Sequence, residues 1–130
     1  MGGPPTLVIP DAPSTGIVTF YSRHPNPPAM SWFGHVWIRI EGVGTYGFYP
    51  RGVLEESAAI ADLSYKSPKS KKLNRAVDVL RSYSNRPYNL VVQNCIDLCR
   101  ETAEAIGLNA PSGFGKGPSE WLGDLAAANL

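Results

Sequence analysis

The chain has 130 residues, 43% of them apolar, which is the size and composition of one ordinary globular domain. Twelve Lys and Arg side chains are balanced by eleven Asp and Glu, and the net charge of +1 does not indicate a nucleic-acid-binding protein or one drawn to an anionic membrane. No apolar stretch approaches the roughly 18 residues of a membrane-spanning helix, so the sequence predicts no transmembrane segment.

The N-terminal segment is rich in glycine and proline. It predicts a flexible leader over residues 1–15, followed by a single domain over residues 16–130. The leader has neither the basic start nor the apolar stretch of a secretory signal peptide. Two locations therefore stay open: the cytoplasm, or the periplasm after export by a signal-independent secretion system.

Short runs of β-branched and aromatic residues predict strands in the first half of the chain. Residues 16–22 form one such run. Residues 35–41 alternate between two faces, with the aliphatic side chains on one face and His35 on the other. A glycine-rich turn then leads into residues 45–49, so the two runs are expected to form an antiparallel hairpin.

Helical periodicity dominates the second half, after a segment over residues 54–65 that is ambiguous between helix and strand. Asn94 and Ser119 are suited to cap the second and third of the predicted helices. These helices span residues 73–83, 95–106 and 119–128. The expected fold is α+β, with an antiparallel sheet and the helix that starts at Cys95 packed on one face.

Cys95 and His35 carry the functional interpretation. Cys95 would open a helix, where the dipole and unpaired amides favour a thiolate and can bind a developing oxyanion. His35 lies in a strand pattern and would accept the thiol proton. Each residue also has a purely structural interpretation, Cys95 as a small buried apolar residue and His35 as a half-exposed strand residue. Taken together, the two favour nucleophilic catalysis.

Metal and disulfide chemistry are not expected. Cys95 and Cys99 lie four residues apart in a helical pattern, which places them on one face rather than in disulfide geometry. With His24 and His35 as the only histidines, a four-ligand metal site is improbable, and no cofactor is predicted. Cys99 is assigned to packing.

Three motifs resemble the circularly permuted branch of the NlpC/P60 papain-like superfamily, in which histidine precedes cysteine. They are Gly34-His35-Val36-Trp37-Ile38-Arg39-Ile40, Thr45-Tyr46-Gly47-Phe48-Tyr49-Pro50 and Asn94-Cys95-Ile96-Asp97-Leu98-Cys99. This branch includes lecithin:retinol acyltransferase-like proteins, PPPDE peptidases and bacterial amidase-like proteins. The likeness covers about residues 16–107 and implies a papain-like hydrolase fold.

The resemblance implies roles for individual residues. Cys95 matches the nucleophile and His35 the general base. Relatives place a third polar residue on the neighbouring strand, where this chain offers Tyr49, which lies on the His35 face if the hairpin pairs symmetrically about Val43. A backbone carbonyl or water is an equal alternative as the orienting group. The expected substrate-binding residues are Trp37, Tyr46 and Asn94, although packing is the alternative role for Trp37 and Tyr46.

The function expected from the resemblance is a cysteine-dependent amide hydrolase. Peptides of peptidoglycan are the first-choice substrate, and the small size suits a secreted bacterial effector with an inhibitor or immunity protein as partner. A peptidase, deamidase or isopeptidase acting on protein is the closest alternative. A binding or adaptor domain with an inert His-Cys pair is the non-enzymatic one.

Overall fold

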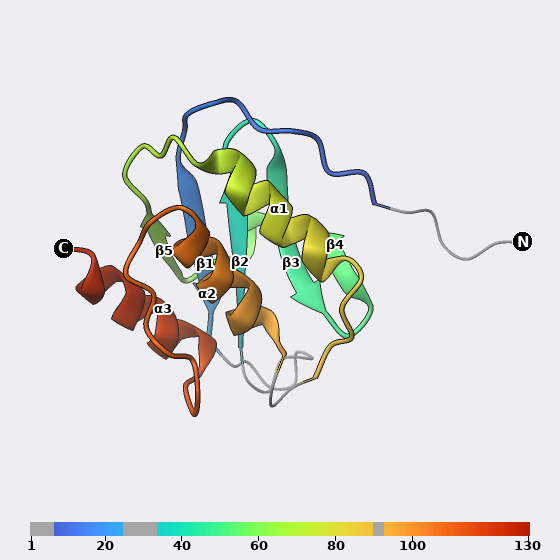
Figure 1. The fold of residues 1–130 in the computed structure, drawn as a ribbon. Coiled ribbons are helices and arrows are strands. Elements are labelled where there is room, and N and C mark those ends of the chain that lie inside the picture. Colours follow the sequence, from blue (N-terminus) through green and yellow to red (C-terminus); the bar gives the residue numbers. More distant parts are fainter. Residues whose placement is uncertain (1–6, 25–33, 90–92) are drawn as a thin grey trace, which may run out of the picture.

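The computed structural model describes residues 7–24, 34–89 and 93–130 (Figure 1). Five strands, a short 3-10 helix and three α-helices make up this part of the chain. In chain order they are β1 (Val18–Arg23), β2 (His35–Ile40), β3 (Gly44–Tyr49), β4 (Gly52–Glu55), η1 (Ala58–Ile60), β5 (Leu63–Lys66), α1 (Leu73–Tyr83), α2 (Cys95–Ala105) and α3 (Pro118–Ala128).

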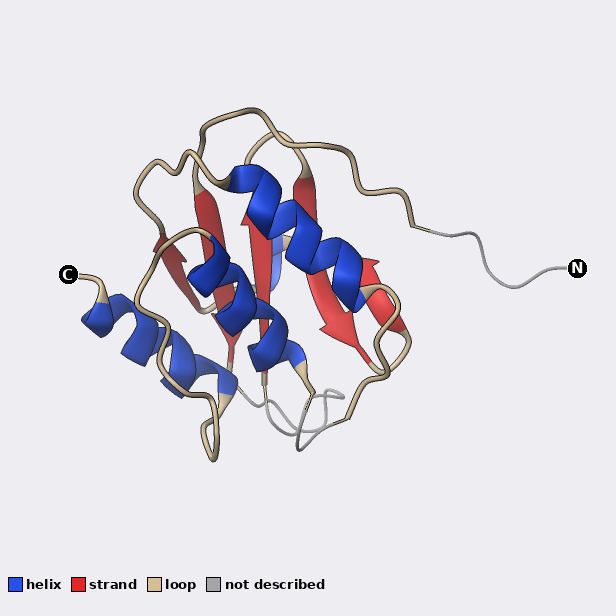
Figure 2. Ribbon diagram, viewed as in Figure 1, coloured by secondary structure: helices blue, strands red, loops and turns tan. Residues whose placement is uncertain are grey.

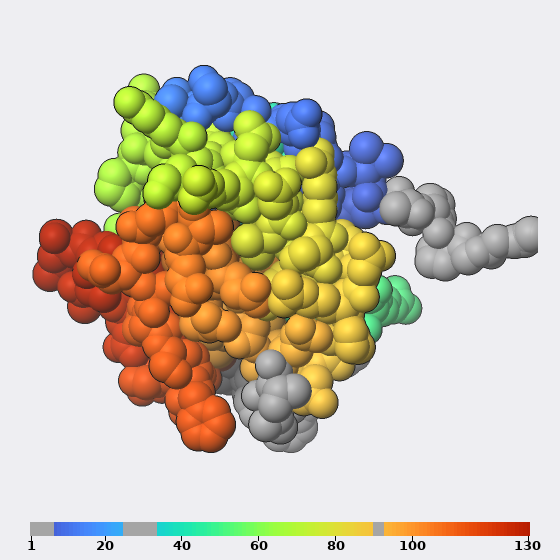
Figure 3. Space-filling view, viewed as in Figure 1, coloured from blue at the N-terminus to red at the C-terminus, as the bar shows by residue number. Residues whose placement is uncertain are grey.

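The strands form one antiparallel sheet in the order β4-β3-β2-β1-β5, and the three α-helices lie on one face of it (Figures 1 and 2). The space-filling view shows the helices closing over the sheet as a continuous layer (Figure 3). Beneath this layer Val36, Ile38 and Ile40 of β2 are fully buried. The predicted α+β class with an antiparallel sheet is confirmed. The alternating pattern of β2 explains the arrangement, because its aliphatic face has to be covered by helices.

The second face of the sheet is covered as well. Strands β4 and β5 lie at opposite edges, so the chain between them has to cross the sheet, and Figure 2 shows η1 on the side away from the α-helices. The crossing is anchored at both ends, where the amide of Glu56 donates to Thr45 and that of Asp62 to Ser22. Trp37 is fully buried on this side, since strand alternation places it on the face opposite the aliphatic residues.

The periodic segments are confirmed. Helix α1 spans residues 73–83 and buries the expected apolar side chains, and α2 begins at Cys95. The ambiguous segment covers the end of β4, all of η1 and most of β5, and these elements are too short for periodicity to distinguish helix from strand. The third helix begins earlier than predicted, because Pro118 occupies its first turn and Gly117 is the N-cap. Ser119 is therefore not the cap, and its hydroxyl lies 3.0 Å from that of Ser22.

Part of the segment expected to be a leader packs against α1. Ile9 is only 6% exposed, and its carbonyl accepts hydrogen bonds from the Arg81 guanidinium. Further along, the amide of Ala12 donates to the side chain of Asn74 at 2.8 Å. Residues 7–15 are thus tied to the domain, while residues 1–6 lie outside the described part of the chain. No helix within the described residues is both long and apolar enough to cross a membrane.

Candidate active site

The start of α2 is fixed by a reciprocal capping box. The Asn94 side chain accepts the amide of Ile96 at 2.9 Å, and the Asp97 carboxylate accepts the amide of Asn94 at 2.8 Å. Two of the unpaired amides of the first turn are thereby satisfied. The capping box confirms Asn94 as the N-cap and places Cys95 at the first position of the helix.

The Cys95 thiol is held in an almost fully buried position. Its side chain is 6% exposed, and burial raises its pKa from the ordinary 9.0 to about 11. The backbone amides of Val36, Cys95 and Ile96 hydrogen-bond the sulfur and lower the pKa, but burial is the larger effect. The amides of the helix start therefore favour the thiolate as expected, but the net pKa shift is upward because desolvation of the charged sulfur outweighs them.

His35 is buried at the start of β2 and is held from two directions. Its ring stacks on Tyr49, with centroids 4.3 Å apart, and on Trp37 at 5.3 Å. Its Nε2 faces the Oε2 atom of Glu56 at 3.4 Å. Both atoms are buried and neither has a hydrogen-bond partner among the described residues, so the nitrogen and the oxygen face each other without a competing partner there. Burial of an unpaired carboxylate would lower the stability of the fold, so the contact between His35 and Glu56 is favoured.

Gly47 makes room for the His35–Glu56 pair. A Cβ atom at Gly47 would lie 2.7 Å from Nε2 of His35 and 3.2 Å from Oε2 of Glu56. Both distances are shorter than ordinary carbon contacts. The absence of a side chain on β3 at this position is therefore a condition for the imidazole and the carboxylate to meet.

Tyr49 is the residue expected to orient His35, and the structure places both Tyr49 and Glu56 against the imidazole. The hairpin pairs Ile38 with Tyr46 and Ile40 with Gly44, so it is centred on Gly42 rather than on Val43 as expected. The reason is a tight turn in which Gly42 adopts a φ of +77°. Tyr49 still lies on the His35 face, where it stacks on the ring, but the charged partner is Glu56.

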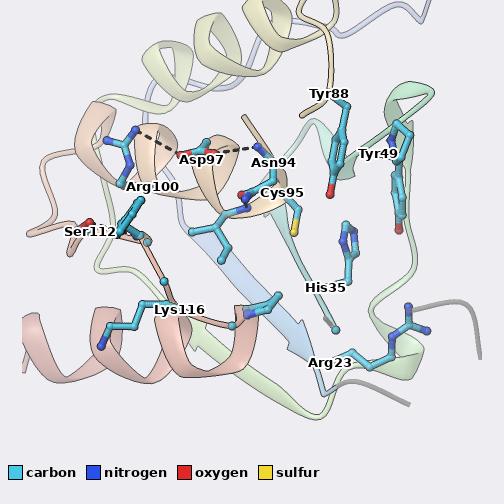
Figure 4. Close-up of a pocket in the computed structure, with 18 of the residues that line it drawn as sticks. Arg23, His35, Tyr49, Tyr88, Asn94, Cys95, Asp97, Arg100, Ser112 and Lys116 are labelled. Atoms are coloured by element: carbon cyan, nitrogen blue, oxygen red, sulfur yellow. Dashed lines mark hydrogen bonds and ion pairs between the residues drawn. The ribbon is translucent and has the colours of Figure 1, made fainter. Parts of the chain in front are cut away.

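His35 and Cys95 line the same pocket although they belong to different sides of the sheet. Helix α2 packs on the face of Val36, whereas His35 shares its face with Trp37 and Tyr49. The described β2–β3 pairing stops at Ile38, short of the strand's first residue, and the pocket runs around this open end. Figure 4 shows the sulfur of Cys95 directed to the side on which His35 lies. The hydrogen bond from the Val36 amide places the sulfur beside the peptide that follows His35.

Tyr88 completes the polar surroundings of the sulfur. Figure 4 shows its ring above both Cys95 and His35, with the hydroxyl pointing down between them. Burial and the neighbouring thiol raise the pKa of Tyr88 to about 12, while the Cys95 amide lowers it. The phenol is therefore a neutral hydrogen-bond donor next to the Cys95 amide, and the two can together bind an oxyanion.

The pocket has a volume of about 1680 Å³. One wall is the first turn of α2, the opposite wall carries His35 and Tyr49, and the loop over residues 110–117 forms a third side. This loop projects from the edge of the molecule between α2 and α3 (Figures 1 and 3). The volume exceeds that of a typical small-molecule site, and the open shape suits an extended substrate.

The structure brings four of the predicted site residues to this pocket, namely Cys95, His35, Tyr49 and Asn94. It does not bring the other two there. Trp37 is fully buried and stacks on Tyr21 and His35. The hydroxyl of Tyr46 donates to the carbonyl of Val43 at the far end of the hairpin.

Sequence reasoning missed Glu56 and Tyr88. Glu56 follows a strand of four residues that periodicity does not identify, and its approach to His35 depends on the crossover that starts there. For Tyr88 a signal was available, because the side chain of an aromatic residue in the loop before α2 can fold back onto the start of that helix.

Comparison with known protein families, characterised proteins and solved structures finds no match. The resemblance to the permuted NlpC/P60 branch therefore depends on the sequence motifs alone.

Proposed function

We propose that the protein is a cysteine-dependent amide hydrolase. The observation that carries the proposal is the joint placement of Cys95 and His35 on one pocket, with Glu56 at the Nε2 atom of the imidazole. A nucleophile, a base and a group that orients the base are the three parts of thiol catalysis. With Nε2 facing Glu56, Nδ1 of His35 is left to exchange a proton with the sulfur.

In the proposed reaction the thiol proton passes to Nδ1 of His35 while the sulfur attacks the amide carbonyl carbon. The oxyanion is bound by the Cys95 amide and the Tyr88 hydroxyl. The intermediate collapses with cleavage of the C–N bond, and the imidazolium of His35 protonates the leaving amine. Water then attacks the thioester, gives a proton to His35, and releases the acid as the C–S bond breaks and the thiol regains its proton.

The raised pKa of Cys95 determines when the proton moves. At neutral pH the unliganded thiol is protonated, because its pKa is about 11. The base therefore has to act during the attack rather than before it. The Glu56 carboxylate favours this step by stabilising the imidazolium that forms, as a charge-assisted partner does.

Peptides of peptidoglycan are the proposed substrate. The motif resemblance supports this choice, and the size and open shape of the pocket suit a peptide better than a small metabolite. A bacterial effector that acts in the periplasm and is neutralised by an inhibitor protein is the corresponding biological setting. Hydrolysis of a protein amide by the same residues is the second candidate, and the same open pocket favours it.

Digestion of purified peptidoglycan, followed by mass analysis of the soluble fragments, tests the proposal. The wild type should release peptides, and Cys95→Ala and His35→Ala should release none. Cys99→Ala and His24→Ala are matched controls that should retain activity, because Cys99 lies in the core and His24 is exposed, and neither lines the pocket. Release of no peptides, together with cleavage of a protein substrate, would move the assignment to the second candidate. Activity that survives Cys95→Ala would overturn both.

A further inference from the structure

Tyr88 reaches the pocket from the loop between α1 and α2, outside any helix or strand. Figure 4 shows its hydroxyl between Cys95 and His35. The ring packs on Phe48 of β3, with centroids 5.2 Å apart. Because the hydroxyl lies at the far end of the side chain, its place depends on how firmly the loop backbone is held.

Gln93 holds both peptide groups that flank Tyr88. Its side-chain amide donates to the carbonyl of Pro87 at 2.7 Å, on the N-terminal side of Tyr88. On the C-terminal side, the amide of Asn89 donates to the Gln93 carbonyl at 2.7 Å, and the Gln93 amide donates to the Asn89 carbonyl at 2.9 Å. Since each peptide group is planar, fixing these two planes fixes both backbone torsions of Tyr88.

Gln93 is joined to the start of the nucleophile helix. It directly precedes Asn94, whose amide is bound by the Asp97 carboxylate in the α2 capping box, and it lies two residues before Cys95. The same helix start therefore determines the positions of the thiol and of Tyr88. Gln93 is not among the residues that line the pocket, so it does not act by touching a substrate held there.

A second attachment of the loop lies farther from Tyr88. The Arg86 guanidinium pairs with the Glu101 carboxylate of α2 at 3.0 Å and lies 4.2 Å from the centroid of the Tyr83 ring. These contacts fix the path of the loop two residues before Tyr88. They do not involve the peptide groups that Gln93 binds.

We infer that Gln93 is a positioning residue that holds the Tyr88 hydroxyl beside the Cys95 thiol. In the proposed hydrolysis this hydroxyl binds the oxyanion, and a donor that is already in place needs no reorganisation when the charge develops. The catalytic part of the inference rests on the proposed function. The part that concerns the position of Tyr88 rests on the hydrogen bonds of Gln93.

Gln93→Met tests the catalytic part, because methionine is also unbranched but lacks the amide donor. We expect kcat to fall about tenfold with little change in KM, since a small displacement of the donor affects the transition state more than substrate binding. The loss should disappear in the Tyr88→Phe background, where the hydroxyl is already absent. Additive losses, or an unchanged kcat in an active Gln93→Met enzyme, overturn the inference.

Asn129→Leu is the matched control. The Asn129 side chain is also half-buried, and its amide donates to a loop carbonyl, that of Asn109, at 2.7 Å. Asn129 follows α3 and does not line the pocket, so this variant should keep the wild-type kcat. An equal fall of kcat in both variants would attribute the effect to general destabilisation and overturn the inference.

A measurement without substrate separates the two proposals. The nuclear Overhauser effect between the rings of Tyr88 and Phe48 should weaken in Gln93→Met and persist in Asn129→Leu. If it does so but the wild type cleaves no amide, the hydrolase assignment fails while the dependence of Tyr88 on Gln93 stands. If the wild type cleaves peptides and the effect keeps its intensity in Gln93→Met, the hydrolase stands and the inference falls.

Discussion

The carboxylate of Glu56 lies 3.4 Å from Nε2 of His35, although strands β2, β3 and β4 separate the two residues along the chain. His35 opens β2, whereas Glu56 follows β4 and starts the crossover to the other edge of the sheet. The imidazole is therefore held by Tyr49 of the neighbouring strand and also by a residue that belongs to neither that strand nor α2. Such an arrangement makes the proposed base sensitive to substitutions that leave the hairpin intact.

Glu56→Gln should lower kcat by roughly 10- to 100-fold with little change in KM, because the amide keeps the shape of the side chain but no longer stabilises an imidazolium. Steady-state kinetics on a peptide substrate give both constants. Glu55→Gln is the control, since Glu55 is the adjacent residue and its side chain is exposed. An unchanged kcat in Glu56→Gln would remove the carboxylate from the proposed mechanism.

Gly47→Ala should disable the site without unfolding the domain. The new methyl group would lie 2.7 Å from Nε2 of His35, so the ring has to leave its observed position. We expect a fall in kcat/KM of at least about tenfold, since small displacements of catalytic groups have effects of this size or larger. Circular dichroism and the kinetic assay report fold and activity separately.

The matched control is Gly123→Ala in α3, where nothing lies within 4 Å of the added methyl group. This helical position should gain about 0.5–1 kcal/mol of stability. Its activity should stay at the wild-type level. Full activity in Gly47→Ala would show that the imidazole does not need its observed position.

Tyr88→Phe should reduce kcat by roughly 100-fold, the effect of removing one oxyanion donor. The phenol is a neutral donor at neutral pH because its pKa is raised to about 12. Tyr46→Phe serves for comparison, since that hydroxyl donates to the Val43 carbonyl and Tyr46 does not line the pocket. Comparable kcat values for Tyr88→Phe and the wild type would show that the Tyr88 hydroxyl does not bind the oxyanion together with the Cys95 amide.

Alkylation of Cys95 should follow a titration midpoint near pH 11, well above the ordinary 9.0 of a cysteine thiol. The cause is burial, which penalises the thiolate. Iodoacetamide labelling rates between pH 6 and about 11.5, with peptide mass analysis to separate Cys95 from Cys99, measure it. A midpoint at or below the ordinary value would mean that the amides and the imidazole outweigh desolvation.

The same pKa shift predicts how stability depends on pH. A thiol whose pKa rises on folding contributes stability that is complete below the unfolded value, near 9.0, and is lost as pH rises towards about 11. The shift corresponds to a loss of about 3 kcal/mol over this interval. Urea denaturation at pH 8 and at about pH 11 should therefore show a smaller decrease for Cys95→Ala than for the wild type. Equal decreases would contradict the shift.

Asn94→Ala should lower the free energy of unfolding by about 1 kcal/mol, because it removes the side-chain acceptor of the α2 capping box. Denaturation by urea measures the difference. Asn85→Ala provides a comparison, since Asn85 is exposed and its side chain makes no hydrogen bond within the described residues. A stability loss of equal size in both variants would show that the cap is not the source.

The periodic elements were predictable because their signal is local. The helical spacing of residues 73–83 and the Asn94 cap identified α1 and the start of α2 from neighbouring residues alone. The alternation along β2 identified its aliphatic face in the same way. Cys95 and His35 stood out for the same reason, since a cap and a strand pattern define their positions without knowledge of the rest of the chain.

Other features depended on contacts between distant segments. The short strands β4 and β5 carry too few residues for a period, and the path between them determines that Trp37 is buried and that Glu56 reaches His35. The sign of the Cys95 pKa shift was also decided by tertiary packing, because burial by the surrounding layers exceeds the effect of the helix start.

The amino-acid sequence by itself thus determined the type of the long elements and the limits of α1 and the start of α2, and it singled out Cys95 and His35 as the proposed catalytic pair. Only the tertiary structure decided the partner of the imidazole and the protonation of the sulfur. The physical reason is that backbone periodicity and capping act over a few residues, whereas desolvation and ion pairing depend on which distant segments exclude water together.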